Sequence, residues 1–184
     1  MTATARRLLT WIAGFVAFPL GGVAATAVVG RIDDPSAALI GGAAVGLVLG
    51  AGQALVAGGR LDARRWIPAT VVGSAAGLLL GAATVDYGTS LPALAAMGAL
   101  TGIPVGLAQA LALDPGRARW LWAAAQPVLW AAGWTVTTLA GIDVEQQYAV
   151  FGSTGALTFM LLSGLLLERV AGLRTQPVVV SSPR

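Results

Sequence analysis

The sequence predicts an all-α, polytopic membrane protein: a six-helix bundle built from three parallel two-helix repeats of about 55 residues. The composition is 57% hydrophobic and 10% charged, with a mean hydropathy of +0.80, whereas a soluble domain carries about 25% charged residues. The apolar residues fall into runs of about 20, the length that crosses about 30 Å of hydrocarbon. A glycine pattern also recurs at a fixed interval. A soluble helical protein of this composition would have too few polar residues to cover its surface.

The apolar runs are separated by short polar loops. The first run follows two arginines and resembles a signal peptide, with Val23-Ala24-Ala25 as a possible cleavage site. Its length and its register with the later runs favour a retained helix. The C-terminal segment is rich in Ser, Pro and Val, and we expect poor order there. The predicted spans are 8–29, 36–57, 66–85, 91–113, 120–142 and 148–167, followed by a cytoplasmic tail over 170–184.

The arginines predict the orientation in the membrane. Six spans place alternate loops on opposite sides, and one side then carries ten of the eleven arginines. By the positive-inside rule, both termini are cytoplasmic. A sequence rich in Ala and Gly, with arginine and no lysine, suggests a bacterial inner-membrane protein. The basic character therefore reflects topology and contact with anionic lipids rather than nucleic-acid binding. The arginine-rich side holds Arg6, Arg7, Arg60, Arg64, Arg65, Arg117, Arg119, Arg169, Arg174 and Arg184; the other side holds Arg31.

Two predicted helices carry the same stripe of three glycines and one glutamine, 56 residues apart. Offsets of 4, 8 and 11 residues share one helix face, and small residues at four-residue steps let membrane helices approach closely. The span 66–85 carries three further glycines at the same steps. We expect these glycines to pack helices together, although such a stripe could also line a pore or a cleft. They are Gly42, Gly46, Gly50, Gly73, Gly77, Gly81, Gly98, Gly102 and Gly106.

The remaining spans extend the repeat. Each odd-numbered span has a tryptophan followed eleven residues later by a glycine, as in Trp66 and Gly77. The last span carries a weaker copy of the stripe, in which Met160 replaces a glycine and Ser163 replaces the glutamine. Two helices return the chain to the same side, so the three hairpins are parallel repeats about an axis along the membrane normal.

Three glutamines are candidate site residues. Gln53 and Gln109 lie about one turn inside the arginine-rich ends of their helices. A buried amide can hold neighbouring helices together through hydrogen bonds; alternatively, these two residues and Ser163 form a polar ring at the mouth of a pathway. Gln126 precedes Pro127, which can kink its helix, and it is a candidate for a specific ligand contact.

Trp130 and Trp134 lie four residues apart in the middle of the fifth span. They could stack on a flat apolar ligand such as a quinone, a carotenoid or a lipid tail, or they could fill space opposite glycines. Four other tryptophans lie near predicted span ends, where an interfacial aromatic belt explains them. These are Trp11, Trp66, Trp120 and Trp122.

Several chemistries are excluded by composition. The chain contains no Cys and no His, which removes disulfides, thiolate or imidazole metal sites and histidine-based catalysis. No ionisable residue lies in the middle of a predicted span, which argues against ion-coupled transport. The sequence therefore predicts no catalytic residue, no metal site and no cofactor.

The chain resembles a set of bacterial multi-pass membrane proteins that carry repeated Gly-xxx-Gly-xx-Gln helices, each followed by a basic turn and a helix starting with tryptophan. The resemblance covers residues 40–133, and the last span departs from it by losing the glutamine. The resemblance implies no activity and no site residues.

The expected function is non-catalytic. We expect a binding or scaffolding role within the membrane, with a lipid, another membrane protein or a second copy of the chain as partner and no nucleic acid. The alternative is an uncoupled channel or facilitator for a small neutral or cationic solute.

Overall fold

The computed structural model describes residues 1–174 of the chain, and all regular secondary structure within them is helical. This confirms the predicted all-α class. Side chains are described through residue 169. The elements are α1 (Ala3–Ala13), η1 (Gly14–Val16), α2 (Ala17–Val29), α3 (Pro35–Val56), α4 (Ala63–Thr84), α5 (Leu91–Ala112), α6 (Arg117–Leu139) and α7 (Ser153–Arg174).

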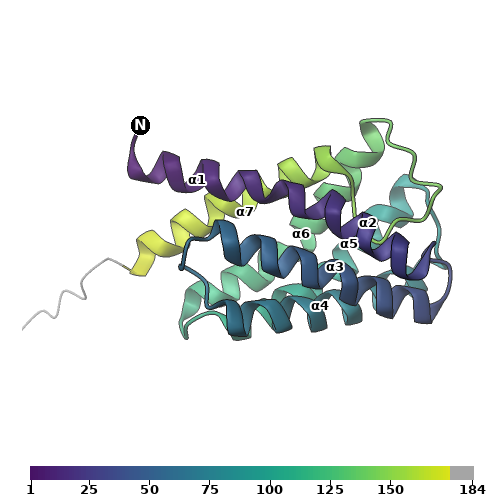
Figure 1. Ribbon diagram of the computed structural model, residues 1–184, viewed down its shortest axis with the longest axis horizontal. Coiled ribbons are helices and arrows are strands. Elements are labelled where there is room, and N and C mark those ends of the chain that lie inside the picture. Colours follow the sequence, from purple (N-terminus) through teal and green to yellow (C-terminus); the bar gives the residue numbers. More distant parts are fainter. Residues whose placement is uncertain (175–184) are drawn as a thin grey trace, which may run out of the picture.

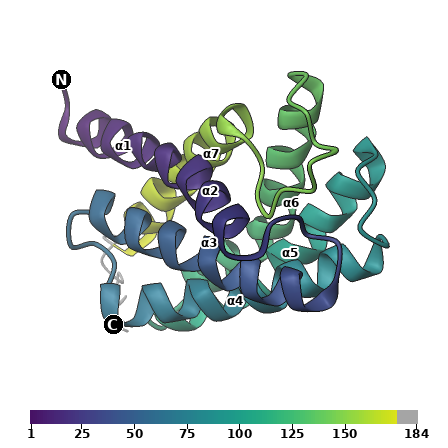
Figure 2. The ribbon, with the colours of Figure 1, turned by 45° about the vertical axis from the view of Figure 1, so that its right-hand side comes forward.

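The helices form a bundle in which each packs against its neighbour in sequence, and α7 also packs against α1, η1 and α2. Figure 1 shows the helices running along the long axis, with the N terminus and the end of α7 at one end of the bundle. The connection between α6 and α7 lies at the opposite end, beside α2, as Figure 2 also shows.

Four helical segments are long and apolar enough to cross a membrane. Helices α6 and α7, with 23 and 22 residues, have the length of a membrane span, and their crossing stays a prediction. The apolar segments are Ala3–Val29, Pro35–Val56, Ala63–Thr84 and Leu91–Ala112.

The first segment is one predicted span but is interrupted by the short 3₁₀ helix η1. The interruption lies three to five residues before Pro19. Proline has no backbone N–H and its ring clashes with the carbonyl four residues earlier, which is that of Phe15. The backbone adjusts locally at Gly14–Val16, so that α1 and α2 continue one another with a change of helix type.

The last helix differs from its predicted position. It spans Ser153–Arg174 rather than 148–167, so the first five residues of the predicted span lie in the α6–α7 connection. Those residues are apolar, which is why the hydropathy pattern includes them, but three of them are buried in the core from a non-helical backbone. At its other end the helix continues into the predicted tail as far as Arg174; residues 175–184 lie outside the described part of the chain.

The glycine stripes lie where helix backbones meet. A Cβ atom added at Gly46 on α3 would lie 2.6 Å from the carbonyl oxygen of Thr70 on α4. A Cβ atom added at Gly77 of α4 would lie 2.5 Å from the carbonyl oxygen of Thr101 on α5. Real Cβ atoms essentially never make contacts this short. Glycine at these positions therefore lets the two helix backbones come closer than any other residue would allow. The α5–α6 interface repeats the arrangement with Gly98, Gly102 and Gly106 against Trp130, Gln126, Pro127 and Ala123.

Helix α3 begins with a well-formed cap. The carboxylate of Asp34 accepts hydrogen bonds from the backbone N–H of Ser36 at 2.7 Å, from its hydroxyl at 2.6 Å and from the N–H of Ala37 at 2.9 Å. Pro35 occupies the first helical position, where its missing N–H costs nothing. These hydrogen bonds, chiefly the one from the Ser36 hydroxyl, lower the pKa of Asp34 from its ordinary value.

Substituting Gly46 should weaken the fold more than the same change on the exposed side of α3. We expect Gly46→Val to lower the free energy of unfolding by about 1–3 kcal/mol, because the new side chain forces the α3 and α4 backbones apart. Ala51→Val is the matched control, since Ala51 is exposed on the same helix. Thermal unfolding in detergent measures both variants, and equal effects would show that the α3–α4 contact does not depend on glycine.

The Asp34 cap should make stability depend on pH. Because the folded pKa lies below the unfolded one, the stabilisation is present above about pH 4 and is lost as pH falls through the folded pKa. Asp34→Asn keeps a capping oxygen that does not titrate. We expect the wild-type melting temperature to fall more than that of Asp34→Asn between about pH 6 and pH 3. Parallel pH profiles would contradict the lowered pKa.

Candidate functional site

The two glutamines of the stripes lie buried near the arginine-rich end of the bundle, and each accepts a hydrogen bond from an indole. The Nε1 of Trp66 donates to Oε1 of Gln53 at 3.0 Å, and the Nε1 of Trp122 donates to Oε1 of Gln109 at 3.0 Å. The Nε2 of Gln109 donates to the Thr70 hydroxyl at 3.0 Å and to Oε1 of Gln53 at 3.4 Å. The two amides thus belong to one hydrogen-bonded cluster.

A third indole makes the corresponding bond with the last helix. The Nε1 of Trp11 donates to the hydroxyl of Ser163 at 3.1 Å. The ring of Trp122 contacts those of Trp11 and Trp66 edge-on, with centroids 6.5 and 5.7 Å apart. The three indoles therefore fill the space among Gln53, Gln109 and Ser163.

These contacts correct the interpretation of three tryptophans as an interfacial belt. Trp11, Trp66 and Trp122 are each 1% exposed, and each donates its N–H inside the bundle. Their positions near the helix ends gave the same sequence signal as a belt. Trp120 differs, since it is 49% exposed and carries the guanidinium of Arg119 over its ring, as an interfacial residue can.

The two tryptophans in the middle of α6 belong to an aromatic cluster. Trp130 and Trp134 both contact the ring of Phe151 edge-on, at 5.4 and 6.0 Å between centroids. Phe18 of α2 stacks on Phe151 at 5.0 Å, and Phe159 of α7 contacts Phe18, Trp130 and Phe151. The phenylalanines carry no repeat signal, so only the two tryptophans were candidates from sequence.

Gln126 is fully buried, and neither atom of its side-chain amide has a hydrogen-bond partner within the described residues. Its Cβ and Cγ lie against Gly106 of α5. The indole nitrogen of Trp130 and the hydroxyl of Thr137, on the same helix, also have no partner among the described residues. The inner face of α6 therefore carries three of the buried side chains whose polar groups have no partner in the described part of the chain.

A pocket of about 570 Å³ opens between α2, the end of α6 and the start of α7. This size falls within the range of small-molecule sites, and an apolar lining with a few polar groups is typical of them. Of the candidate residues, Trp134 lines it, whereas Gln126 and Trp130 do not. Hydroxyl groups in its lining come from Thr26, Thr137, Tyr148 and Ser153, and the rest of the lining includes Pro19, Val23, Ile142, Val150 and Phe151.

The late start of α7 explains this pocket. Helices α3 and α5 begin 18 residues before Gln53 and Gln109, whereas α7 begins ten residues before Ser163. The eight missing residues correspond to about 12 Å of helix. Non-helical chain takes their place beside α2 and leaves the hollow.

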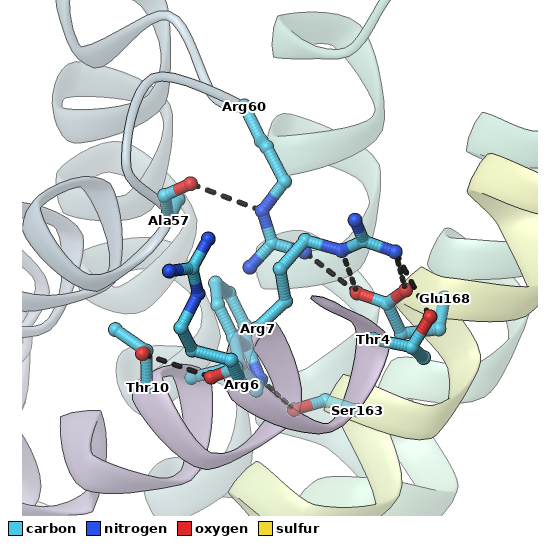
Figure 3. Close-up of polar contacts among 9 residues, drawn as sticks. Thr4, Arg6, Arg7, Thr10, Ala57, Arg60, Ser163 and Glu168 are labelled. Carbon is cyan, nitrogen blue, oxygen red and sulfur yellow. Dashed lines mark hydrogen bonds and ion pairs between the residues drawn. The ribbon is translucent and has the colours of Figure 1, made fainter. Parts of the chain in front are cut away.

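Polar contacts at the two ends of the bundle join the last helical hairpin to the first. At the arginine-rich end, the carboxylate of Glu168 on α7 lies between two guanidinium groups (Figure 3). One belongs to Arg7 of α1, at 3.0 Å, and the other to Arg60 of the α3–α4 turn, at 2.9 Å. Arg60 also donates to the carbonyl of Ala57, at the end of α3. Glu168 is 15% exposed, so its pairs are better shielded from water than most surface ion pairs.

At the opposite end, Gln147 joins three loops. Its carbonyl accepts from the N–H of Ile32, its Oε1 accepts from Arg31, and its Nε2 donates to the carbonyl of Tyr87. Neither Gln147 nor Glu168 stood out in the sequence, because isolated polar residues in loops carry no periodic signal. The indole–amide pairs did leave a periodic signal in the sequence, because the spacing of 13 residues from Gln53 to Trp66 recurs from Gln109 to Trp122.

Within the described residues, no group of three or more acidic side chains is placed to hold a metal ion. Comparison with protein-family models, curated proteins and solved structures finds no match to this chain. The site must therefore be interpreted from its own geometry.

Two buried glutamines should respond differently to the same substitution. Gln109→Met leaves the Trp122 N–H without an acceptor, so we expect a loss of about 1–3 kcal/mol in unfolding free energy. Gln126→Met removes an amide that has no partner within the described residues, so we expect no loss or a gain. Thermal unfolding in detergent compares the two variants. A large loss from Gln126→Met would mean that its amide is satisfied by a bound molecule.

Proposed function

We propose that the chain is a six-span inner-membrane protein with both termini in the cytoplasm, built from three two-helix repeats. The recurring indole bonds support this arrangement: Trp66 and Trp122 bond the stripe glutamine 13 residues earlier, and Trp11 bonds Ser163, which occupies the glutamine position of the last repeat. The third bond then links the last repeat back to the first, as a closed ring requires.

The described arginines agree with the proposed orientation. Arg7 and Arg60 meet at Glu168, and Arg31 bonds Gln147 among the loops of the other end. Grouping of this kind is what the positive-inside rule predicts for a protein whose arginine-rich end is cytoplasmic.

The interface that closes this ring departs from the glycine pattern of the others. At the α3–α4 and α5–α6 interfaces, three glycines bring the backbones together. At the interface of α7 with α1 and α2, Ala156 and Met160 occupy the positions of the second and third glycines. Met160 meets Gly14 through its side chain rather than its backbone, and the shortened α7 leaves the outer half open. The pocket lies in this opening.

We infer that the protein binds the apolar part of a lipid-like molecule in this pocket, without catalysis. The observation that carries the proposal is the pocket of about 570 Å³ between α2, α6 and α7, an interface that the proposed topology places within the membrane. Its lining contains no Asp, Glu or Arg, so a charged solute would lose its hydration without compensation.

The identity of the ligand must follow from shape and from a few polar contacts. Lipid tails are as apolar as the pocket, so transfer from the bilayer supplies no hydrophobic gain. The aromatic faces of Trp134 and Phe151 favour a flat or branched apolar group over a flexible tail. The hydroxyl groups of Thr26 and Tyr148 lie on α2 and on the α6–α7 connection, on the side of the outer loops, where they suit the polar end of such a molecule.

The same contacts give less support to the alternative function, a channel or facilitator for a small solute. Gln53, Gln109 and Ser163 would form the inner mouth of a channel, but each of them accepts an indole N–H. A pathway past them would require the three buried indoles to move. The hydrogen bonds therefore favour a structural role for the two glutamines.

Filling the pocket should remove the bound molecule. We expect native mass spectrometry of the protein, extracted with its lipids, to show a retained apolar molecule at a fixed stoichiometry. Ala27→Trp fills the pocket from α2 and should abolish that mass. Val28→Trp is the matched control, because Val28 is 63% exposed and does not line the pocket.

Two outcomes would contradict the proposal: a wild-type protein that never retains a ligand, or equal ligand loss in both variants. In the first case, solute flux into liposomes becomes the relevant measurement.

A further inference from the structure

A second hollow lies on the lipid-facing side of the bundle, between α4 and α5. Its volume is about 420 Å³, and it shares no residue with the pocket beside α2. It extends from the arginine-rich end of α4 over the eight residues from Arg65 to Val72, whose seven helical steps cover about 10 Å along the axis. The rest of the lining is apolar: Pro68, Ala69 and Val72 of α4, and Ala108, Leu111 and Ala112 of α5.

The shape of this groove follows from the side chains that form it. Alanine and proline are short, whereas Val72 and Leu111 are longer and are 64% and 68% exposed. Small residues next to larger ones leave a trough along the contact between the two helices. Because the trough faces lipid in the proposed topology, an extended hydrocarbon chain can lie in it.

One cation lies at the end of the groove. Arg65 is in the first turn of α4, and its side chain is 66% exposed. Its Nε lies 3.6 Å from Asp62, whose side chain is 52% exposed. An exposed pair at this distance contributes little, so the guanidinium can exchange the carboxylate for a phosphate, which it binds in a bidentate manner.

The charge around the groove selects an anion. In the proposed topology, this end carries eight arginines against three acids among the residues whose side chains are described, and Arg65 is one of the eight. Positively charged hollows between helices at the cytoplasmic surface suit anionic lipid headgroups. A ligand that satisfies both parts of the groove must therefore combine an anionic phosphate with an apolar chain.

We propose that this groove is a binding site for an anionic phospholipid of the cytoplasmic leaflet. The guanidinium of Arg65 binds the phosphate, and one acyl chain lies along Ala69 and Val72 between α4 and α5. The proposal uses the topology proposed above. It does not depend on a ligand in the outer pocket, which is the pocket beside α2 described above.

The test uses the full-length protein, delipidated in detergent and titrated with phosphatidylglycerol or phosphatidylcholine under native mass spectrometry. We expect wild type to prefer phosphatidylglycerol, and Arg65→Gln to lower that affinity by about fivefold or more. Arg64→Gln is the matched control: it removes the same charge from the neighbouring position, which does not line the groove, and should change the affinity by less than about twofold. Equal effects of the two substitutions would mean that a diffuse basic surface attracts the lipid, which overturns the proposal.

The acyl chain is tested separately. Ala69→Phe fills the groove and should lower the affinity for phosphatidylglycerol with Arg65 intact. If this variant does not fold, Leu111→Ala, which removes an exposed wall, should lower the affinity instead. Unchanged affinity in a folded groove variant, or equal binding of the two lipids by wild type, would overturn the site. Neither result would bear on the molecule in the outer pocket.

Discussion

The structure depends on direct contact between helix backbones at glycine. In a bilayer, packing and hydrogen bonding must hold helices together, because lipid competes for every apolar surface. Gly46, Gly77 and Gly102 each face a carbonyl of the next helix at a distance that excludes a side chain. Three successive interfaces are built in this way. Larger side chains are then confined to the interior, where the indoles fill the volume around the buried amides, or to the outer surface of the bundle.

The helix pair that lacks this contact is also where the molecule is open. Helix α7 starts late, and Met160 meets Gly14 through its side chain, whereas α3 meets the α4 backbone directly at glycine. Polar side chains compensate: Glu168 holds one end, Gln147 holds the other, and the Trp11–Ser163 bond lies between them. Departures from the rule that governs the rest of a fold are often functional, and here the departure creates the pocket beside Trp134.

The two proposed binding sites would select their ligands by different physical means. The outer pocket is lined by aromatic rings and hydroxyl groups, so shape and a few hydrogen bonds must distinguish its ligand from the surrounding lipid. The groove between α4 and α5 is shallow and featureless apart from Arg65, so charge must provide its selectivity. A protein with both would hold one molecule within its last interface while anionic lipid covers its arginine-rich half.

The sequence by itself determined the helices, the packing faces and the repeating register of tryptophan and glutamine, because each leaves a periodic pattern at a fixed spacing. It also identified Gln53, Gln109 and Trp134 as candidate site residues, although it did not identify the side chains that they contact. Only the tertiary structure decided that Trp11, Trp66 and Trp122 point inward and that 148–152 is not helical. It also decided that Gln147 and Glu168 close the bundle. Those features depend on contacts between residues distant in sequence, whose free energies outweigh the local preferences that hydropathy and spacing report.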